Sequence, residues 1–370
     1  MGTIVTRSSI TMSRRLPFID GVRGLAAVVV LVGHLIFITP GMREPSLHDA
    51  SLVDLLLWPF RFSGEMVLLF LLVSGFALYY SERTRQMNGR RPTTYREFAA
   101  RRAWRIGPIY YLALAFGLAV APIVRDLTLR PENKVTQLVT VGGVGSHLLF
   151  VQNLNSDWLF QLNSPLWTIA YEIQLYLIFP LIYLSMRRWN PFVSAIAIVI
   201  AVKGVSLLQI GFPVFGLARW FVAGVLLAEL TAQGWRIALK VSLPIGLGAL
   251  LVGMAEIPRL QSESPHDVIW LTAFIFLLFA MLERPDGVRN PMASPVAHWI
   301  GLRSYSLYAL HWPVMLLLLL FAQKIKLTGS GAALAVTLSG IPICFGLTML
   351  AYRLVERPSL RRVAQVARGA

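Results

Sequence analysis

Apolar segments close to the length of a membrane-spanning helix recur along the whole chain. They lie at 24–38, 67–80, 177–184, 191–202 and 314–321, each with further apolar neighbours. A helix of about 20 apolar residues crosses a bilayer, and it satisfies its own backbone hydrogen bonds, as the membrane interior demands. Of the 370 residues 56% are hydrophobic and 14% charged, against roughly one quarter charged in soluble proteins. The chain is therefore predicted to be an all-α, polytopic transmembrane helical bundle.

The net charge of +16 would suggest nucleic-acid binding in a soluble protein, but in this chain it reflects membrane topology. Most Lys and Arg residues stand in short loops between apolar segments, which is the pattern that sets membrane topology. No basic stripe with interleaved aromatic residues lies outside those segments, so nucleic-acid binding is not expected. Cys344 is the only cysteine, which excludes thiolate metal sites and disulfides within the chain. No metal is expected.

The positions of the basic residues predict about ten spans with both termini in the cytoplasm. Arg14 and Arg15 precede the first span, near 21–40, and seven arginines between 83 and 102 follow the second span, which begins near Glu65. Later spans are placed near 104–124, 165–186, 191–210, 214–232, 239–257, 267–282, 299–321 and 331–352. Glycines interrupt the segment 137–154, which is expected to be re-entrant or interfacial.

One integral-membrane domain is predicted for the whole of 1–370. It includes a cytoplasmic segment at 1–15 and a basic cytoplasmic tail at 356–370, and no repeat or long soluble segment indicates a second domain. The apolar run after the basic segment is too long for a signal peptide, so cleavage is not expected.

Ionisable residues inside spans are candidates for function, because inserting each costs about 2.5–3.5 kcal/mol. Arg23 and His34 are eleven residues apart, which brings both to one helix face about 16 Å apart along the axis. Asp20 falls on the same face. A lone histidine in a membrane can also be a packing residue with a satisfied hydrogen bond. Its proton exchange near neutral pH nevertheless suits a base that acts on a hydroxyl.

Glu172 lies about 10 Å below the outer end of its predicted span, a depth similar to that of His34. The two side chains could therefore meet, and a carboxylate orients a histidine base and stabilises its charged form. Asp20 is the alternative support for His34. Trp167, in the same span as Glu172, and Glu65 are candidates for contact with a substrate.

Arg101, Arg102 and Arg105 stand at the cytoplasmic mouth of the third span. Arg102 and Arg105 share a helix face, because they are three residues apart. These arginines could simply follow the charge rule for cytoplasmic loops. Their planar donors equally suit the phosphates of a nucleotide-type donor.

Polar residues also interrupt two other spans. Ser74 and Gly75 lie in the cytoplasmic half of the second span, where a glycine admits either a ligand or a neighbouring helix. Tyr305 and His311 add polar groups near the middle of the span at 299–321 and are candidates for contact with a substrate.

Taken together, these residues resemble the acyltransferase 3 family of bacterial integral-membrane O-acyltransferases. The resemblance covers 18–361, and its main signature is Arg23 followed by His34 in the first span. The other matching stretches are Val73–Phe76, the Arg102 and Arg105 pair, Pro165–Glu172, Ser304–His311 and Val355–Pro358.

The resemblance implies transfer of an acyl group, acetyl by default, from acyl-CoA to a hydroxyl of a glycan, a glycolipid or a related secondary metabolite. It makes His34 catalytic, associates Arg23, Arg102 and Arg105 with the acyl-CoA donor, and gives Glu172 a supporting role. Arg101, Ser74 and Gly75 join the donor-side candidates. The implied location is the plasma (inner) membrane of a bacterium.

One position departs from the family pattern. Ile173 stands where the family commonly has a second acid after the glutamate. A role that needs two adjacent carboxylates is therefore not carried over.

A transporter or flippase for a glycan or lipid-linked intermediate is the main alternative, because buried His, Glu and Arg residues also serve proton-coupled carriers. The absence of an inverted hydropathy repeat counts against it. A purely structural scaffold would leave the buried charges unexplained. Within the enzyme hypothesis, direct transfer with His34 as base and a relay through an acyl-histidine both stay open.

Overall fold

The computed structural model describes residues 16–39, 52–125, 127, 139–207, 216–256, 263–284 and 290–368. All regular elements among these residues are helices, which confirms the all-α prediction. The expected segment 1–15 lies outside the described residues. The predicted span at 299–321 is split, because one helix ends at Gly301 and the next begins at Ser304.

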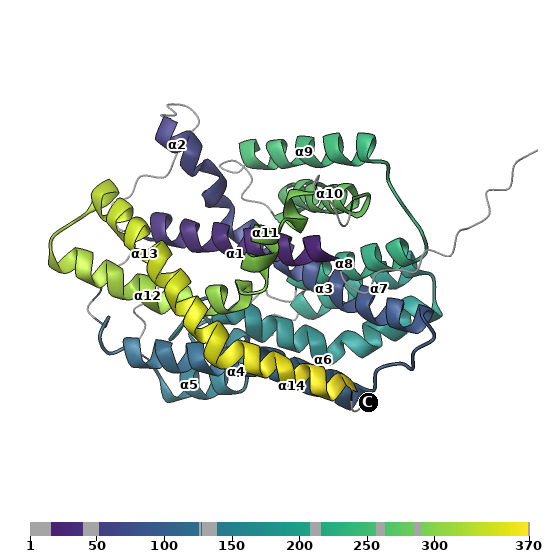
Figure 1. Cartoon of the computed structure of the whole chain (residues 1–370), viewed down its shortest axis with the longest axis horizontal. Coiled ribbons are helices and arrows are strands. Elements are labelled where there is room, and N and C mark those ends of the chain that lie inside the picture. Colours follow the sequence, from purple (N-terminus) through teal and green to yellow (C-terminus); the bar gives the residue numbers. More distant parts are fainter. Residues whose placement is uncertain are drawn as a thin grey trace, which may run out of the picture.

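The helices succeed one another along the chain in Figure 1. They are α1 (Pro17–Phe37), α2 (Leu52–Leu57), α3 (Ser63–Met87), α4 (Tyr95–Val120), α5 (Val141–Leu148), α6 (Leu166–Arg188), α7 (Pro191–Leu207), α8 (Ala218–Ala232), α9 (Leu239–Glu256), α10 (Glu263–Leu282), α11 (Pro295–Gly301), α12 (Ser304–Lys324), α13 (Gly329–Ala351) and α14 (Arg357–Arg368). Short 3₁₀ helices lie at Trp58–Phe62, Gln152–Leu154 and Pro291–Ala293, and a π-helical turn lies at Tyr352–Glu356.

Six helical segments of the described chain are long and apolar enough to cross a membrane. They are Pro17–Phe37, Leu55–Met87, Tyr95–Val120, Leu166–Arg188, Ser304–Lys324 and Gly329–Val366. Three more apolar helices are shorter, at Pro191–Gly204, Leu239–Ala255 and His266–Leu282. These helices indicate an integral membrane protein, whereas ten crossings and two cytoplasmic termini stay predictions. Helix α5 has eight residues and is about 12 Å long, too short to cross alone.

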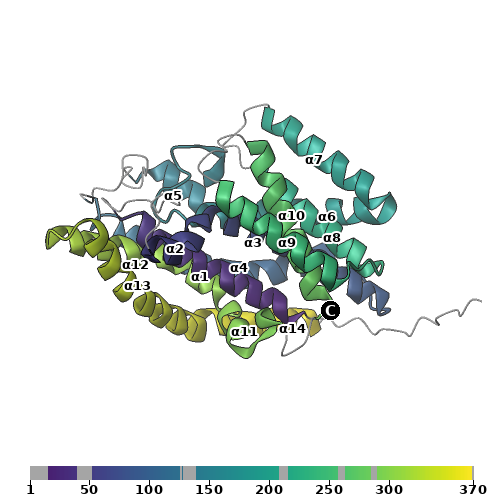
Figure 2. The same ribbon diagram turned by 90° about the horizontal axis from the view of Figure 1, so that it is seen from above.

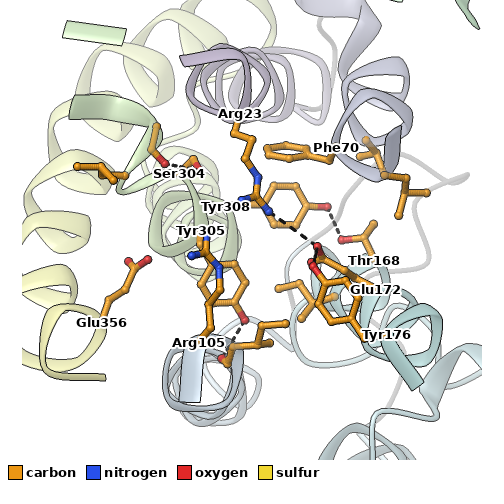
Figure 3. Close-up of a pocket in the computed structure, with 16 residues that line it drawn as sticks. Arg23, Phe70, Arg105, Thr168, Glu172, Tyr176, Ser304, Tyr305, Tyr308 and Glu356 are labelled. Carbon is orange, nitrogen blue, oxygen red and sulfur yellow. Dashed lines mark hydrogen bonds and ion pairs between the residues drawn. The ribbon is translucent and has the colours of Figure 1, made fainter. Parts of the chain in front are cut away.

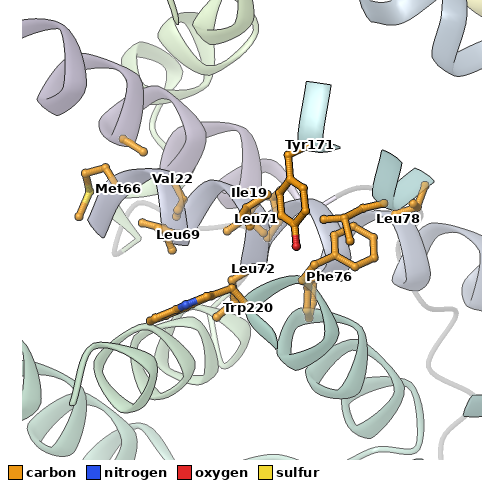
Figure 4. Packing of buried hydrophobic residues seen from close by; sticks show 14 of the residues in the cluster. Ile19, Val22, Met66, Leu69, Leu71, Leu72, Phe76, Leu78, Tyr171 and Trp220 are labelled. Carbon is orange, nitrogen blue, oxygen red and sulfur yellow. The ribbon is translucent and has the colours of Figure 1, made fainter. Parts of the chain in front are cut away.

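The first helix, α1, occupies the middle of the bundle. It packs against α3, α11, α12 and α13. Helices α9 and α10 lie side by side on one flank, away from the pair formed by α12 and α13 (Figures 1 and 2). Side chains of α1, α3, α6 and α8 form the core shown in Figure 4, with Ile19, Val22, Leu72, Phe76, Tyr171 and Trp220 among its members.

Glycines allow α3 and α8 to approach closely. A Cβ atom at Gly75 would come within 2.1 Å of the Phe221 carbonyl oxygen, and one at Gly224 within 1.9 Å of the Leu72 carbonyl oxygen. Small residues at the contact of two membrane helices permit this kind of backbone packing. Gly75 therefore serves the contact of two helices.

The C-terminal helix α14 lies along α4 (Figure 1). Pro108 lies inside α4 and has no N–H to donate to the carbonyl group of Trp104, four residues earlier. The Ser359 hydroxyl of α14 donates to that carbonyl oxygen instead. The proline thus creates the acceptor that holds the C-terminal helix in place.

Candidate active site

A small polar pocket lies between α1, α3, α4, α6 and α12, and we call it the central pocket (Figure 3). Its volume is about 60 Å³. The charged residues that line it are Arg23, Arg105, Glu172 and Glu356. Two cations and two carboxylates balance each other, so the pocket does not select an ion of either sign by charge.

Glu172 connects three helices around this pocket. Its Oε1 atom accepts hydrogen bonds from the Ser74 hydroxyl at 2.5 Å and from the Tyr176 hydroxyl. The same oxygen lies 3.8 Å from Nη2 of Arg23. Figure 3 shows the Arg23 side chain pointing toward Glu172. The structure therefore brings Arg23, Glu172 and Ser74 together, as a polar centre shared by α1, α6 and α3.

Two tyrosines of α12 form another part of the lining. The Tyr305 hydroxyl donates to the Ile106 carbonyl oxygen at 3.0 Å. The Tyr308 hydroxyl is hydrogen bonded to Oγ1 of Thr168 at 2.9 Å, and its ring packs on Phe70 with 5.5 Å between centroids. Tyr305 thus lines the central pocket, and its expected contact with a substrate stays a prediction.

A larger cavity adjoins the central pocket beside α3, α4 and α6, and we call it the basic cavity. Its volume is about 480 Å³. The charged residues in its lining are Glu82, Arg85, Arg101, Arg102 and Arg105. Arg105 lines both spaces, so it marks their junction. Four cations against one carboxylate favour an anionic ligand.

Arg102 is held by aromatic rings rather than by a carboxylate. Its guanidinium lies 5.2 Å from the Tyr176 ring centroid and 5.6 Å from that of Phe98. Its Nε atom is buried without a hydrogen-bond partner among the described residues. Arg101 donates to the Thr93 hydroxyl at 2.8 Å. Arg102 therefore retains a donor for a ligand.

His34 forms a pair with His311 of α12. Nδ1 of His34 lies 2.9 Å from Nε2 of His311, and the rings stack with centroids 5.2 Å apart. Trp312 packs against His34 in a T-shaped arrangement at 5.3 Å. Neither histidine lines the central pocket, but the ring of Tyr308, which does, lies 6.0 Å from that of His311. The histidine pair thus adjoins the pocket behind Tyr308.

The expected contact between His34 and Glu172 is wrong, since Glu172 binds Arg23, Ser74 and Tyr176. The reason lies at the start of α6, which is buried inside the bundle rather than at its outer surface. There the Asn163 side chain donates to the carbonyl oxygens of Ala113 on α4 and Ala309 on α12. A count of residues from the helix end therefore underestimates the depth of Glu172.

Asp20 also lies elsewhere than expected, because its Oδ2 atom is 3.3 Å from Nδ1 of His298 on α11. Among the described residues no contact joins Asp20 to His34, so the expected support of His34 by Asp20 is wrong. Glu65 lies 3.5 Å from Nε2 of His266 on α10. Glu65, Trp167 and Gly75 are absent from the described linings of both spaces.

Glu356 is a site residue that the sequence analysis missed. It is 6% exposed, accepts a hydrogen bond from the Ser306 hydroxyl and lines the central pocket. The π-helical turn that precedes α14 ends at this residue, and such turns often occur at functional sites. The available signal was the family-matching stretch Val355–Pro358, which contains this acid but to which no role was assigned.

A family model described as an acyltransferase domain matches residues 16–352. The chain belongs to the acyltransferase 3 family. This acyltransferase is 27% identical over 317 residues to the exopolysaccharide production protein ExoZ of Rhizobium meliloti (strain 1021), an alignment that covers 82% of the chain and 91% of ExoZ. It is 25% identical over 386 positions to the acyltransferase MdmB of Streptomyces mycarofaciens, covering 94% of the chain and 92% of MdmB. No solved structure matches.

Membership of this family makes the protein an enzyme that transfers acyl groups other than aminoacyl groups. A transporter or flippase, the alternative left open by the sequence, is not what the family or the named relatives indicate.

Proposed function

We propose that this membrane enzyme moves an acyl group, acetyl by default of its family, from acyl-CoA to a hydroxyl group of a glycan, a glycolipid or a related secondary metabolite. The name of one relative supports a glycan acceptor, since that protein takes part in exopolysaccharide production, and the name of the other supports acyl transfer itself. The enzyme acts in the plasma (inner) membrane of a bacterium.

The observation that carries the proposal is the basic cavity beside the central pocket. The phosphates of coenzyme A are its only anionic groups, and they suit a space lined by Arg85, Arg101 and Arg102. The thioester at the end of the pantetheine arm is neutral. This small end group suits the central pocket, where the charges of Arg23 and Arg105 are matched by Glu172 and Glu356. Arg105, at the junction, lies where the two parts of the donor meet.

His34 acts as the general base. Its Nε2 atom takes the proton from the acceptor hydroxyl as the oxygen attacks the thioester carbonyl carbon. The tetrahedral intermediate then expels the coenzyme A thiolate, which recovers the proton from His34. An ester and free coenzyme A are formed, and the enzyme returns to its first state. In the relay variant, His34 itself would be acylated first.

Incubation of the purified protein with radiolabelled acetyl-CoA and candidate acceptors tests the transfer. His34→Ala should reduce turnover by about 10²- to 10⁴-fold, the usual contribution of a general base, while the amount of membrane-inserted protein is unchanged. Turnover retained in this variant would refute the role of His34. Mass spectrometry of surface glycans and secreted metabolites from a deletion strain would identify the acceptor.

A further inference from the structure

The hydrogen bonds of His311 determine which of its ring nitrogens carries the proton. Nδ1 lies 2.8 Å from the carbonyl oxygen of Tyr308 and 3.3 Å from that of Leu307, one helical turn earlier. A carbonyl oxygen only accepts hydrogen bonds, so Nδ1 must be the donor. A neutral imidazole has a single N–H, and Nε2 of His311 is therefore an acceptor.

The same reasoning extends to His34. Its Nδ1 atom lies 2.9 Å from Nε2 of His311, so Nδ1 of His34 must donate the hydrogen bond. The proton of the neutral ring is then on Nδ1, and Nε2 keeps its lone pair. The hydrogen bond found for the His34 ring among the described residues is the one from Nδ1 to His311, which leaves Nε2 outside it.

We propose that His311 is a positioning residue, which holds His34 in the tautomer with Nε2 unprotonated and thus ready to accept the hydroxyl proton. This inference rests on the proposed role of His34 as base, and it replaces the substrate contact that the sequence suggested for His311. A base is useful only in the correct tautomer and orientation, which a hydrogen-bonded partner provides. Here the partner is a neutral imidazole in place of a carboxylate.

The surrounding helix fixes His311 in turn. Pro313 of α12 leaves the carbonyl oxygen of Ala309 without its helical donor, and the Asn163 side chain supplies one at 2.9 Å. Trp312, the next residue of α12, makes a T-shaped contact with the His34 ring. His311 is 1% exposed. The acceptor for His34 is therefore held by a well-packed turn of α12.

Two substitutions of His311 test whether this residue positions His34 or only fills space between the helices. Gln carries a carbonyl oxygen near the place of Nε2, so His311→Gln keeps an acceptor for His34. Asn is shorter, so His311→Asn keeps a donor for the Tyr308 carbonyl but leaves His34 without its partner. We expect kcat to fall by roughly 10²-fold in His311→Asn, the lower range for losing a general base. In His311→Gln we expect it to fall much less, with the KM for acetyl-CoA unchanged in both.

Comparable kcat values in the two folded variants, or a lower value in His311→Gln, would overturn the proposal. Thermal unfolding in detergent verifies that each variant is folded. Should His311→Asn not fold, His311→Met takes its place, because it fills the volume without a strong acceptor. His34→Ala is measured alongside. If that variant remains active, the base assignment fails; if it is inactive while His311→Asn matches His311→Gln, only the positioning role fails.

Discussion

Arg102 lines the basic cavity and is the residue at which we expect a phosphate of the donor to bind. Aromatic rings of Phe98 and Tyr176 flank its guanidinium, and its Nε atom is buried without a partner among the described residues. A buried donor without an acceptor costs free energy. A bound phosphate would supply the missing acceptor, and the rings preorganise the guanidinium plane for a bidentate contact.

Replacing Arg102 by Gln should therefore weaken donor binding. A hydrogen bond to a charged group contributes about 1.5–3 kcal/mol, which corresponds to a rise of roughly 10- to 100-fold in the KM for acetyl-CoA. Arg96→Gln is the matched control, because Arg96 belongs to the same helix, is exposed and does not line the cavity. The KM values are obtained by titrating acetyl-CoA at a fixed acceptor concentration. Equal effects of the two substitutions would argue against a phosphate contact at Arg102.

At the scale of helices, prolines and glycines determine how the elements meet. Pro108 in α4 and Pro313 in α12 each free a carbonyl oxygen four residues earlier. Ser359 of α14 and Asn163, just before α6, donate to these two oxygens. Helix breaks in the membrane are tolerated where neighbouring segments satisfy the freed groups. Both helices continue through their prolines, and the freed carbonyl oxygens bind α14 and the segment before α6.

Substitution of Gly75 tests whether this residue serves the contact of α3 with α8 or the binding of the acyl donor. Gly75→Ala places a Cβ atom against the Phe221 carbonyl oxygen on α8, and overpacking of this kind costs about 1–3 kcal/mol. We expect a lower melting temperature, with the KM for acetyl-CoA unchanged in the folded protein. Gly64→Ala is the control on the same helix, since a Cβ atom there meets nothing within 4 Å. A raised KM at unchanged melting temperature would restore Gly75 to the donor site.

At the scale of the whole molecule, the charged ends of several helices meet on one side. Glu229 of α8 accepts hydrogen bonds from Tyr79 and Arg83 of α3 at 3.0 Å each and lies 3.8 Å from Arg187 of α6. The basic cavity is lined from the same ends of α3 and α6. The positive-inside rule predicts that this side faces the cytoplasm, from which the proposed acyl-CoA donor would enter the cavity.

Labelling of single cysteines tests this orientation. Cys344, the only native cysteine, is buried and can be replaced by Ala to give a cysteine-free background. Arg90→Cys, between α3 and α4, should react with a membrane-impermeant maleimide only after the cells are permeabilised. Lys324→Cys, in the last turn of α12, should react in intact cells. The opposite pattern would invert the topology and place the basic cavity outside the cytoplasm.

The sequence alone determined that this protein folds in a membrane and which of its residues are candidates for function. Long apolar runs have no stable alternative to helices in a membrane, and charges as costly to bury as Arg23, His34 and Glu172 indicate function wherever they point. The arginines at the start of the third span likewise indicated a possible contact with the phosphates of a donor. These inferences depend on the composition and residue spacing within single helices, so they need no knowledge of contacts between helices.

Only the tertiary structure decided which of these residues meet. Glu172 is bound to Arg23 and Ser74, and His34 is bound to His311. The start of α6 is buried because Asn163 is hydrogen bonded to α4 and α12, and this contact positions Glu172 deep in the bundle. Spacing along one helix gives the face of a side chain but not the height or rotation of its neighbours. Packing between helices fixes that height and rotation. It therefore also decides which side chain becomes the partner of His34, the proposed catalytic base.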